Sequence, residues 1–189
     1  MRVGVVSDSH GEIKNLKRAV EKLIEKHSVE VIVHLGDNYD DAVVLKNLGI
    51  KVIRVPGVFS NHYQNKNIFN RVVETFNGKR VLITHTEKSH ENDLPDDLKP
   101  EELIGKKAVD VVFYGHTHIP KVEERQGILY VNPGHLKTMD KKGYPPSFAV
   151  VDFQNKVNVT IYTLEGEIVQ NKVFLTTLER FDFPFTAHT

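Results

Sequence analysis

Several side chains that could bind metal ions follow the ends of expected strands in this sequence. They are Asp8, His10, Asp37, Asn61, His62, His85, His116 and His118. Carboxylate and imidazole groups without any thiolate suit Mn, Fe, Zn, Ni or Co better than a soft metal. The number of donors also exceeds what one tetrahedral ion takes. Two ions that share a carboxylate are therefore the simplest interpretation, and that arrangement is typical of two-metal hydrolysis.

The first part of the chain alternates between strands and helices. Short apolar runs at residues 3–6, 29–35 and 51–55 predict three buried strands. A helical stripe of apolar residues between the first two runs predicts an amphipathic helix, and residues 40–48 are expected to form a short helix. This order predicts parallel strands covered by helices. The carboxyl ends of such strands share one edge of the sheet, where ligands bind.

The rest of the chain favours antiparallel pairing. Asn77-Gly78 is a strong turn signal and predicts a hairpin between residues 68–76 and 79–84. A long polar and acidic loop is expected over residues 85–99, and a helix over 101–108. The acidic stretch 87–102 favours a solvated loop over a lid. Further strands are predicted at residues 109–114, 122–125, 128–131, 147–152, 157–164 and 167–176. The fold class predicted from these elements is α/β.

The composition limits the classes of protein that fit this sequence. The 189 residues carry 25 basic and 25 acidic side chains, and zero net charge argues against binding nucleic acid through bulk positive charge. No cysteine is present, which excludes disulfides and cysteine nucleophiles. The acidic residue Asp8 comes too early for the apolar core of a signal peptide, and no apolar run is long enough for a membrane helix. We therefore expect a cytoplasmic protein that does not bind membranes. Residues 1–189 are expected to form one domain, with 171–189 as a C-terminal extension of uncertain order.

Other polar residues have structural interpretations. Asp8 and Asp40 could cap helices, although Asp40 or Asp41 could instead orient a metal ligand. His27 and His34 are expected to be packed in the interior. His90 and His135 could border the site, but loop positions are favoured for both. Each candidate ligand alone would therefore be weak evidence, and the argument for a metal site depends on the whole set.

The motifs Asp8-x-His10, Gly36-Asp37-x-x-Asp40, His85 and Gly115-His116-x-His118 resemble those of the calcineurin-like metallophosphoesterase family, in particular its small bacterial and archaeal phosphodiesterases. The resemblance extends from residue 1 to about residue 164. It implies a four-layer α/β/β/α sandwich with a di-metal centre at the strand ends. Carried over residue by residue, it implies that Asp8, His10 and His118 hold the first ion, that Asp37 bridges, and that His85 and His116 hold the second ion.

The sequence departs from the family pattern at two places. The family has Gly-Asn-His or Gly-Asn-Cys after the third strand, whereas Gly57 is followed here by Val58, which cannot bind a metal. If this loop is three residues longer, Asn61 becomes a ligand of the second ion and His62 a candidate acid for the leaving group. Thr86 also stands where the family usually has glycine.

The resemblance leads to a hypothesis of function. We expect a phosphodiesterase with two divalent ions, Mn²⁺ first among them, and Ni²⁺, Fe²⁺, Zn²⁺ or Co²⁺ as the other candidates. A hydroxide that bridges the ions would attack phosphorus, with Asp37 and His62 as catalytic residues. The expected substrate is a small phosphodiester. Nucleic acid is less favoured, and the oligomeric state stays open. The alternative is a catalytically weakened scaffold or binding module of the same fold, similar to a retromer subunit, which Val58 and Thr86 would suit.

Overall fold

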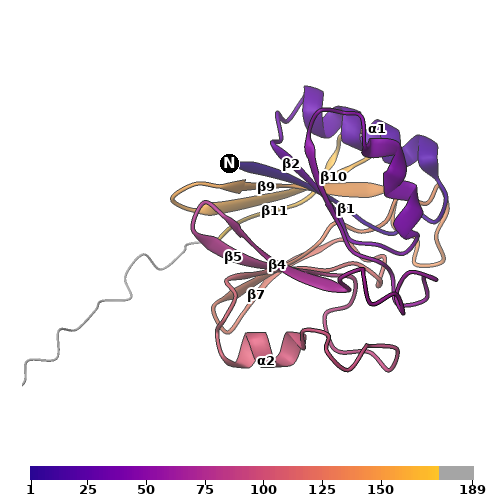
Figure 1. Cartoon of the computed structure of the whole chain (residues 1–189). Coiled ribbons are helices and arrows are strands. Elements are labelled where there is room, and N and C mark those ends of the chain that lie inside the picture. Colours follow the sequence, from indigo (N-terminus) through magenta and orange to yellow (C-terminus); the bar gives the residue numbers. More distant parts are fainter. Residues whose placement is uncertain (175–189) are drawn as a thin grey trace, which may run out of the picture.

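Two mixed β-sheets packed face to face form the centre of the computed structural model, which describes residues 1–174 (Figure 1). Helix α1 (Ile13–Glu25) and the 3-10 helix η1 (Tyr39–Leu45) pack on the outer face of the six-stranded sheet. Helix α2 (Pro100–Gly105) packs on the outer face of the five-stranded sheet. The predicted four-layer α/β/β/α sandwich is confirmed.

The six-stranded sheet has the order β11-β10-β9-β1-β2-β3. Its parallel strands are β1 (Arg2–Val6), β2 (Val31–His34) and β3 (Lys51–Arg54). Its antiparallel strands are β9 (Ser147–Phe153), β10 (Val157–Thr163) and β11 (Ile168–Phe174). Because β9 pairs with β1, the antiparallel part of this sheet joins the parallel part at these two strands.

The five-stranded sheet has the order β4-β5-β6-β8-β7. β4 (Arg71–Phe76) and β5 (Lys79–Thr84) form the hairpin predicted around Asn77-Gly78. β6 (Val111–Phe113) and β8 (Ile128–Asn132) continue parallel to β5, and β7 (Lys121–Arg125) is an antiparallel edge. The carboxyl ends of β5 and β6 therefore lie at one edge of this sheet.

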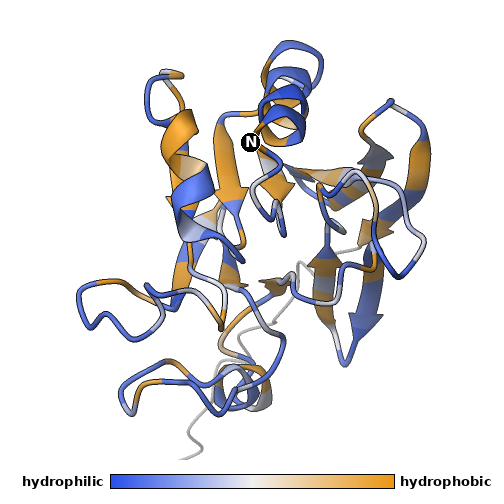
Figure 2. Cartoon of the chain, turned by 90° about the vertical axis from the view of Figure 1, so that its right-hand side faces the viewer, coloured by the Kyte–Doolittle hydropathy of each residue, from blue (hydrophilic) through white to orange (hydrophobic). Residues whose placement is uncertain are grey.

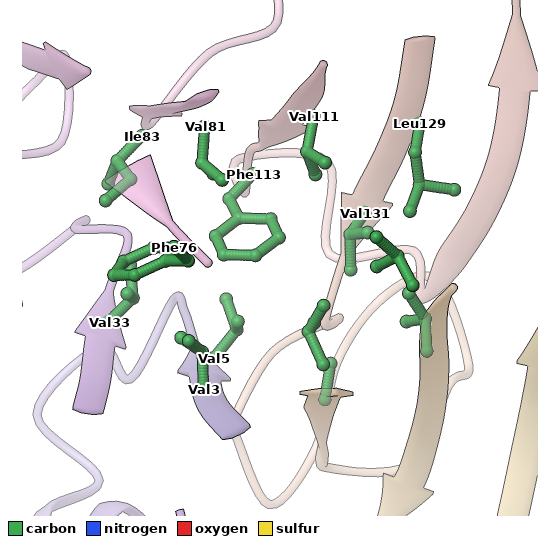
Figure 3. Close-up of a cluster of buried hydrophobic side chains, with 14 of the residues drawn as sticks. Val3, Val5, Val33, Phe76, Val81, Ile83, Val111, Phe113, Leu129 and Val131 are labelled. Carbon is green, nitrogen blue, oxygen red and sulfur yellow. The ribbon is translucent and has the colours of Figure 1, made fainter. Parts of the chain in front are cut away.

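Alternate residues of the central strands fill the space between the two sheets. Val3 and Val5 of β1 face Val111 and Phe113 of β6 across this core (Figure 3). Val112, between them, points to the other face of the sheet and packs towards α2. Burying a side chain of this size is worth about 1.5–3 kcal/mol, so the alternation fixes which residues can point outward. In Figure 2 the connecting loops are mostly blue, while the strands include long orange stretches and some are of mixed colour.

The boundaries of several elements differ from those expected. The helix expected over 40–48 is a 3-10 helix that ends at Leu45, and the helix expected over 101–108 begins at Pro100 and ends at Gly105. The strand expected from residue 68 begins at Arg71. Leu48, the apolar residue of the expected helix that lies beyond Leu45, is 45% exposed, so burial does not extend η1 to residue 48.

The proposed C-terminal extension lies mostly outside the described residues. Residues 171–174 belong to β11, while the last two residues of the strand expected over 167–176, and the rest of the extension, are not described. Within residues 1–174, no helix has the length and apolar character that crossing a membrane requires.

A buried arginine anchors the loop between β5 and α2, which the sequence suggested to be solvated. Arg71 of β4 is buried, and its guanidinium donates to the Asp93 carboxylate at 2.9 Å and to the carbonyl of Leu98 at 3.1 Å. The Tyr63 hydroxyl donates to the same carboxylate at 2.6 Å. A buried guanidinium requires such partners. These bonds tie the loop before β4 to the loop after β5.

Candidate metal centre

Asp and His side chains from both sheets converge where four strands end. Asp8 and His10 follow β1, Asp37 follows β2, His85 follows β5, and His116 and His118 follow β6. Two groups within this set have one possible ligand atom per residue, all within 4.8 Å of one another: Asp8, His10 and His118, and Asp8, Asp37 and His85. The parallel arrangement expected from the sequence therefore brings six of the predicted ligands together.

The first group is built around Asp8. The Nε2 atoms of His10 and His118 are 2.9 Å apart, and His118 Nε2 is 3.4 Å from Asp8 Oδ1. Neighbouring ligand atoms of an ion with bonds of about 2.1 Å are themselves roughly 3–3.4 Å apart. The spacing of the three donor atoms therefore fits a single ion.

The tautomers of these histidines point to the same conclusion. His10 Nδ1 lies 2.8 Å from Asp37 Oδ2, and His118 Nδ1 lies 2.6 Å from Asp140 Oδ1. Since a carboxylate only accepts, each Nδ1 carries the proton, and in the neutral rings each Nε2 keeps its lone pair. Two lone pairs and the Asp8 carboxylate that face one another repel unless a positive charge lies between them. That charge is either a metal ion or a proton on His118 Nε2, because hydrogen bonds to Asp8 and Asp140 raise the pKa of His118. The site thus fits a bound metal ion.

The second group shares Asp8 with the first. His85 Nδ1 donates to the carbonyl of Leu35 at 2.8 Å, so its Nε2 keeps a lone pair, and that atom lies 3.2 Å from His116 Nδ1. A backbone acceptor on one ring nitrogen is a common way to orient a metal-binding histidine. Asp8, rather than Asp37, is the carboxylate common to both groups, and Asp37 lies against His10.

Local electrostatics keep Asp8 ionised. Its burial raises the pKa, but hydrogen bonds from His118 and Ser7 and the charge of His85 lower it more, to about 2. The Ser7 hydroxyl donates to Oδ2 at 2.5 Å, and the backbone N–H of His116 donates to the same oxygen at 2.9 Å. Burial lowers the pKa of His116 and so favours its neutral form, which is the form that binds metals.

The backbone at this edge is in an uncommon conformation. Five of the six converging residues have a positive φ: Asp8 at 50°, His10 at 47°, Asp37 at 71°, His116 at 65° and His118 at 62°. Residues other than glycine rarely adopt this left-handed region, and Asp and His are among those that do so more often. Such outliers concentrate at functional sites because the surrounding structure must hold them.

Two glycines allow the close approach of neighbouring segments. A Cβ on Gly57 would lie 2.7 Å from the backbone oxygen of Asp37, and a Cβ on Gly115 would lie 2.7 Å from Asp8 Oδ2. The same Cβ would lie even closer to the Ser7 hydroxyl oxygen, so the side chains of Ser7 and Asp8 together leave no space for one at position 115. The close packing at Gly57 likewise brings the loop after β3 against the loop that carries Asp37.

Asp140, which the sequence did not single out, supports the first group. Its side chain is only 3% exposed, and it binds His118 Nδ1, the backbone N–H of Lys142 and the Lys137 ammonium. It lies in the loop between β8 and β9, 22 residues from His118. No periodicity or motif marks it, so only the tertiary structure could identify it.

The polar residues for which the sequence allowed structural roles lie as follows. Asp41 Oδ2 accepts from the Ser9 hydroxyl at 2.7 Å and from the N–H of Gly11 at 2.8 Å, so it positions the loop that carries His10. Neither Asp8 nor Asp40 caps a helix, since the N-caps are Glu12 and Asn38. His34 is fully buried as expected, and His135, which was expected in a loop, is also buried, with its ring 5.4 Å from that of His118.

Asn61 and His62 lie in a neighbouring shallow depression of about 310 Å³. His62 Nε2 is 2.9 Å from Asp40 Oδ2, and Asn61 is exposed. None of the six converging residues lines this depression. Val58 is buried, and its carbonyl accepts a hydrogen bond from Asn92, so the residue after Gly57 serves for packing.

The sequence model of the calcineurin-like phosphoesterase superfamily domain matches residues 1–156. The chain belongs to this superfamily. The superfamily is metal-dependent and its chemistry is the hydrolysis of phosphoesters, so the chain is a hydrolase of the metallophosphoesterase type.

Individual relatives agree with this membership. Phosphodiesterase MJ0936 of Methanocaldococcus jannaschii is 28% identical over 147 residues, which are 71% of this chain and 83% of that protein. The structure of Yfce, a phosphoesterase from E. coli, superposes with a TM-score of 0.67 at 23% identity over 91% of this chain and 98% of the other. The structure of Vacuolar Protein Sorting 29 from Cryptosporidium parvum superposes with a TM-score of 0.66 at 23% identity. The match covers 92% of this chain and 97% of the other. At these identities the two structures show a shared fold.

Proposed function

We propose that this metallophosphoesterase is a phosphodiesterase that uses two divalent ions, with Mn²⁺ as the preferred metal. The observation that carries the proposal is the pair of donor groups that share Asp8 at the carboxyl ends of the strands. Their nitrogen and oxygen donors, without thiolate, suit this class of ion.

The converging residues would bind the two ions in two sets of ligands. Asp8, His10 and His118 would hold one ion, and Asp37, His85 and His116 would complete the other, with Asp8 between the groups. The bridging role that the resemblance implies for Asp37, and the ligand role of Asn61, remain part of this proposal. When bound, the ions would supply a water of lowered pKa as the nucleophile and would neutralise charge on the phosphoryl oxygens.

His62 is proposed as the proton donor to the leaving alkoxide. Its Nε2 is paired with Asp40 Oδ2 at 2.9 Å, and this hydrogen bond lowers the pKa of Asp40. The ionised carboxylate would hold the ring in place, and Nδ1 would carry the proton to the substrate. A fixed histidine of this kind typically contributes about 10²–10⁴-fold to a rate.

The proposed substrate is a small phosphodiester, and the proposed location is the cytoplasm. The zero net charge argues against a substrate bound through many phosphates, as nucleic acid would be. The alternative of a scaffold has one observation in its favour, which is the buried Val58 at the position of a family ligand.

Metal removal and replacement tests the proposal. The protein is stripped with a chelator, reloaded with each candidate ion, and assayed with bis(p-nitrophenyl) phosphate while bound metal is counted per chain. We expect two ions per chain, the fastest turnover with Mn²⁺, and loss of most activity in Asp37→Asn and His116→Ala. Asp96→Asn is the matched control, because Asp96 is exposed and lies outside the site. Turnover of Asp37→Asn near that of the wild type would overturn the assignment, and no turnover with any ion would favour the scaffold.

A further inference from the structure

An exposed aromatic side chain stands beside the metal centre. Phe59 is 72% exposed, and the centre of its ring lies 6.3 Å from that of His116 and 5.6 Å from that of His90. Single exposed apolar residues are common on protein surfaces, so exposure alone says little. What distinguishes Phe59 is its place next to a side chain of the proposed metal centre.

The loop that carries Phe59 is fixed on both sides of it. Val58 and Tyr63 are buried, and the Val58 carbonyl accepts from Asn92 at 3.0 Å. The Ser60 N–H donates to the carbonyl of Gly57 at 2.9 Å, and Tyr63 donates to Asp93. Because the backbone is held before and after Phe59, its ring is presented outward by the fold rather than left on a free tip. A preorganised aromatic loses little freedom when it binds a ligand.

Two shallow depressions meet at Phe59. One, of about 310 Å³, contains Asp40 and His62, and the other, of about 540 Å³, contains Gln64 and Asn92. The amide groups of Gln64 and Asn92 donate to the carbonyls of Asn92 and Val58, and within residues 1–174 their amide oxygens make no hydrogen bond. An aromatic face with amide acceptors at its edge suits a planar group that carries N–H donors.

We propose that Phe59 determines specificity by stacking on a planar aromatic group of the substrate phosphoester, a nucleobase being the group that best fits the neighbouring amides. The inference rests on the proposed function, since it requires a phosphoester bound at the adjacent metal centre. Stacking on an aromatic side chain tolerates different bases, because every base has a π-face. The loop after β3 would therefore contribute an apolar platform beside the metal centre.

Binding of two phosphonates that cannot be hydrolysed tests the inference without turnover. Phenylphosphonate and methylphosphonate are titrated calorimetrically into the Mn²⁺-loaded protein. We expect the wild type to bind phenylphosphonate about tenfold more tightly, equivalent to about 1.4 kcal/mol. Phe59→Ala should remove this preference and leave methylphosphonate affinity within about twofold, while Phe59→Tyr retains the preference. Phe69→Ala is the matched control, because Phe69 is 75% exposed and lines neither depression.

The outcomes separate this inference from the proposed function. An equal preference in Phe59→Ala and the wild type, a wild type without preference, or no binding of either phosphonate would overturn the role of Phe59. Hydrolysis of methyl p-nitrophenyl phosphate and of thymidine 5′-p-nitrophenyl phosphate is then compared. A Phe59→Ala variant that loses kcat/KM only for the thymidine ester would support the inference. A Phe59-dependent phosphonate preference without any turnover would instead refute the phosphodiesterase and leave an aromatic phosphoester-binding site.

Discussion

Acidification is expected to destabilise the fold through His34, the last residue of β2. The side chain is fully buried, and the N–H of Gly36 donates to its Nδ1 at 3.2 Å. Nδ1 therefore has no proton, and Nε2 donates to the Ser9 hydroxyl at 3.2 Å, which in turn donates to Asp41. A second proton on the ring would break the bond from Gly36 and leave a charge in the interior.

The magnitude follows from the pKa of His34. Burial lowers this pKa from 6.5 to about 4, and the carboxylates of Asp41 and Asp8 oppose the shift only in part. Between these two pKa values the unfolded chain binds a proton that the folded protein does not bind, so stability falls as the pH falls. At 1.36 kcal/mol per unit, the loss between about pH 8 and about pH 5 is about 2 kcal/mol, and it approaches about 3 kcal/mol below pH 4.

Urea unfolding of chelator-treated protein at these two pH values measures the effect. Metal is removed because metal binding also depends on pH. His34→Gln keeps an amide donor for Ser9 but cannot titrate. We expect the variant to lose about 2 kcal/mol less than the wild type between the two pH values, whatever its stability at high pH. Equal losses in the two proteins would refute the reasoning, since the other titrating groups are common to both.

Three further predictions concern the metal centre. Asp140→Asn should weaken Mn²⁺ binding by roughly 10–100-fold in a titration, because the His118 ring loses its carboxylate acceptor; an unchanged affinity would contradict this. Gly115→Ala should cost roughly 1–3 kcal/mol in denaturant unfolding and reduce bound metal, since the new Cβ would displace the Ser7 hydroxyl and the Asp8 carboxylate that it hydrogen-bonds. Full stability and metal content would show that the loop adapts. His62→Gln should slow hydrolysis of a cyclic nucleotide by about 100-fold but leave bis(p-nitrophenyl) phosphate within about twofold, because p-nitrophenolate leaves without an acid. An equal loss on both substrates would argue against His62 as the acid.

The residues that converge could be predicted because their positions follow from topology. Asp8, Asp37 and His85 come directly after apolar runs, and parallel strands place their carboxyl ends at one edge. The residue types are restricted by the chemistry of metal binding, so type and position point to the same site. The candidate ligand after each strand could therefore be identified from the sequence, without knowing which strands pair.

The supporting residues could not be predicted, because each acts through a contact that the fold alone creates. Asp140 reaches His118 from the loop between β8 and β9, and Arg71 reaches Asp93 from a strand of the hairpin. In the sequence, Arg71 is an ordinary polar residue inside the strand predicted over 68–76, and residues 85–99 are a polar loop. Both segments matter because Arg71 is buried and needs partners from the loop. No pattern in the neighbouring sequence indicates that a charged side chain will be buried.

The backbone conformation at the metal centre favours a site that binds metal over a scaffold protein of the same fold. Five residues other than glycine hold positive φ values at strand ends, at roughly 1 kcal/mol each. A total near 5 kcal/mol is comparable to the whole stability of many domains, which is about 5–15 kcal/mol. A scaffold gains nothing from turning five side chains towards one point, and selection for stability alone would replace several of them with glycine. Their donor atoms also face one another at distances that fit a cation. We therefore infer that the constraint maintained at this edge is metal binding by the six converging Asp and His side chains.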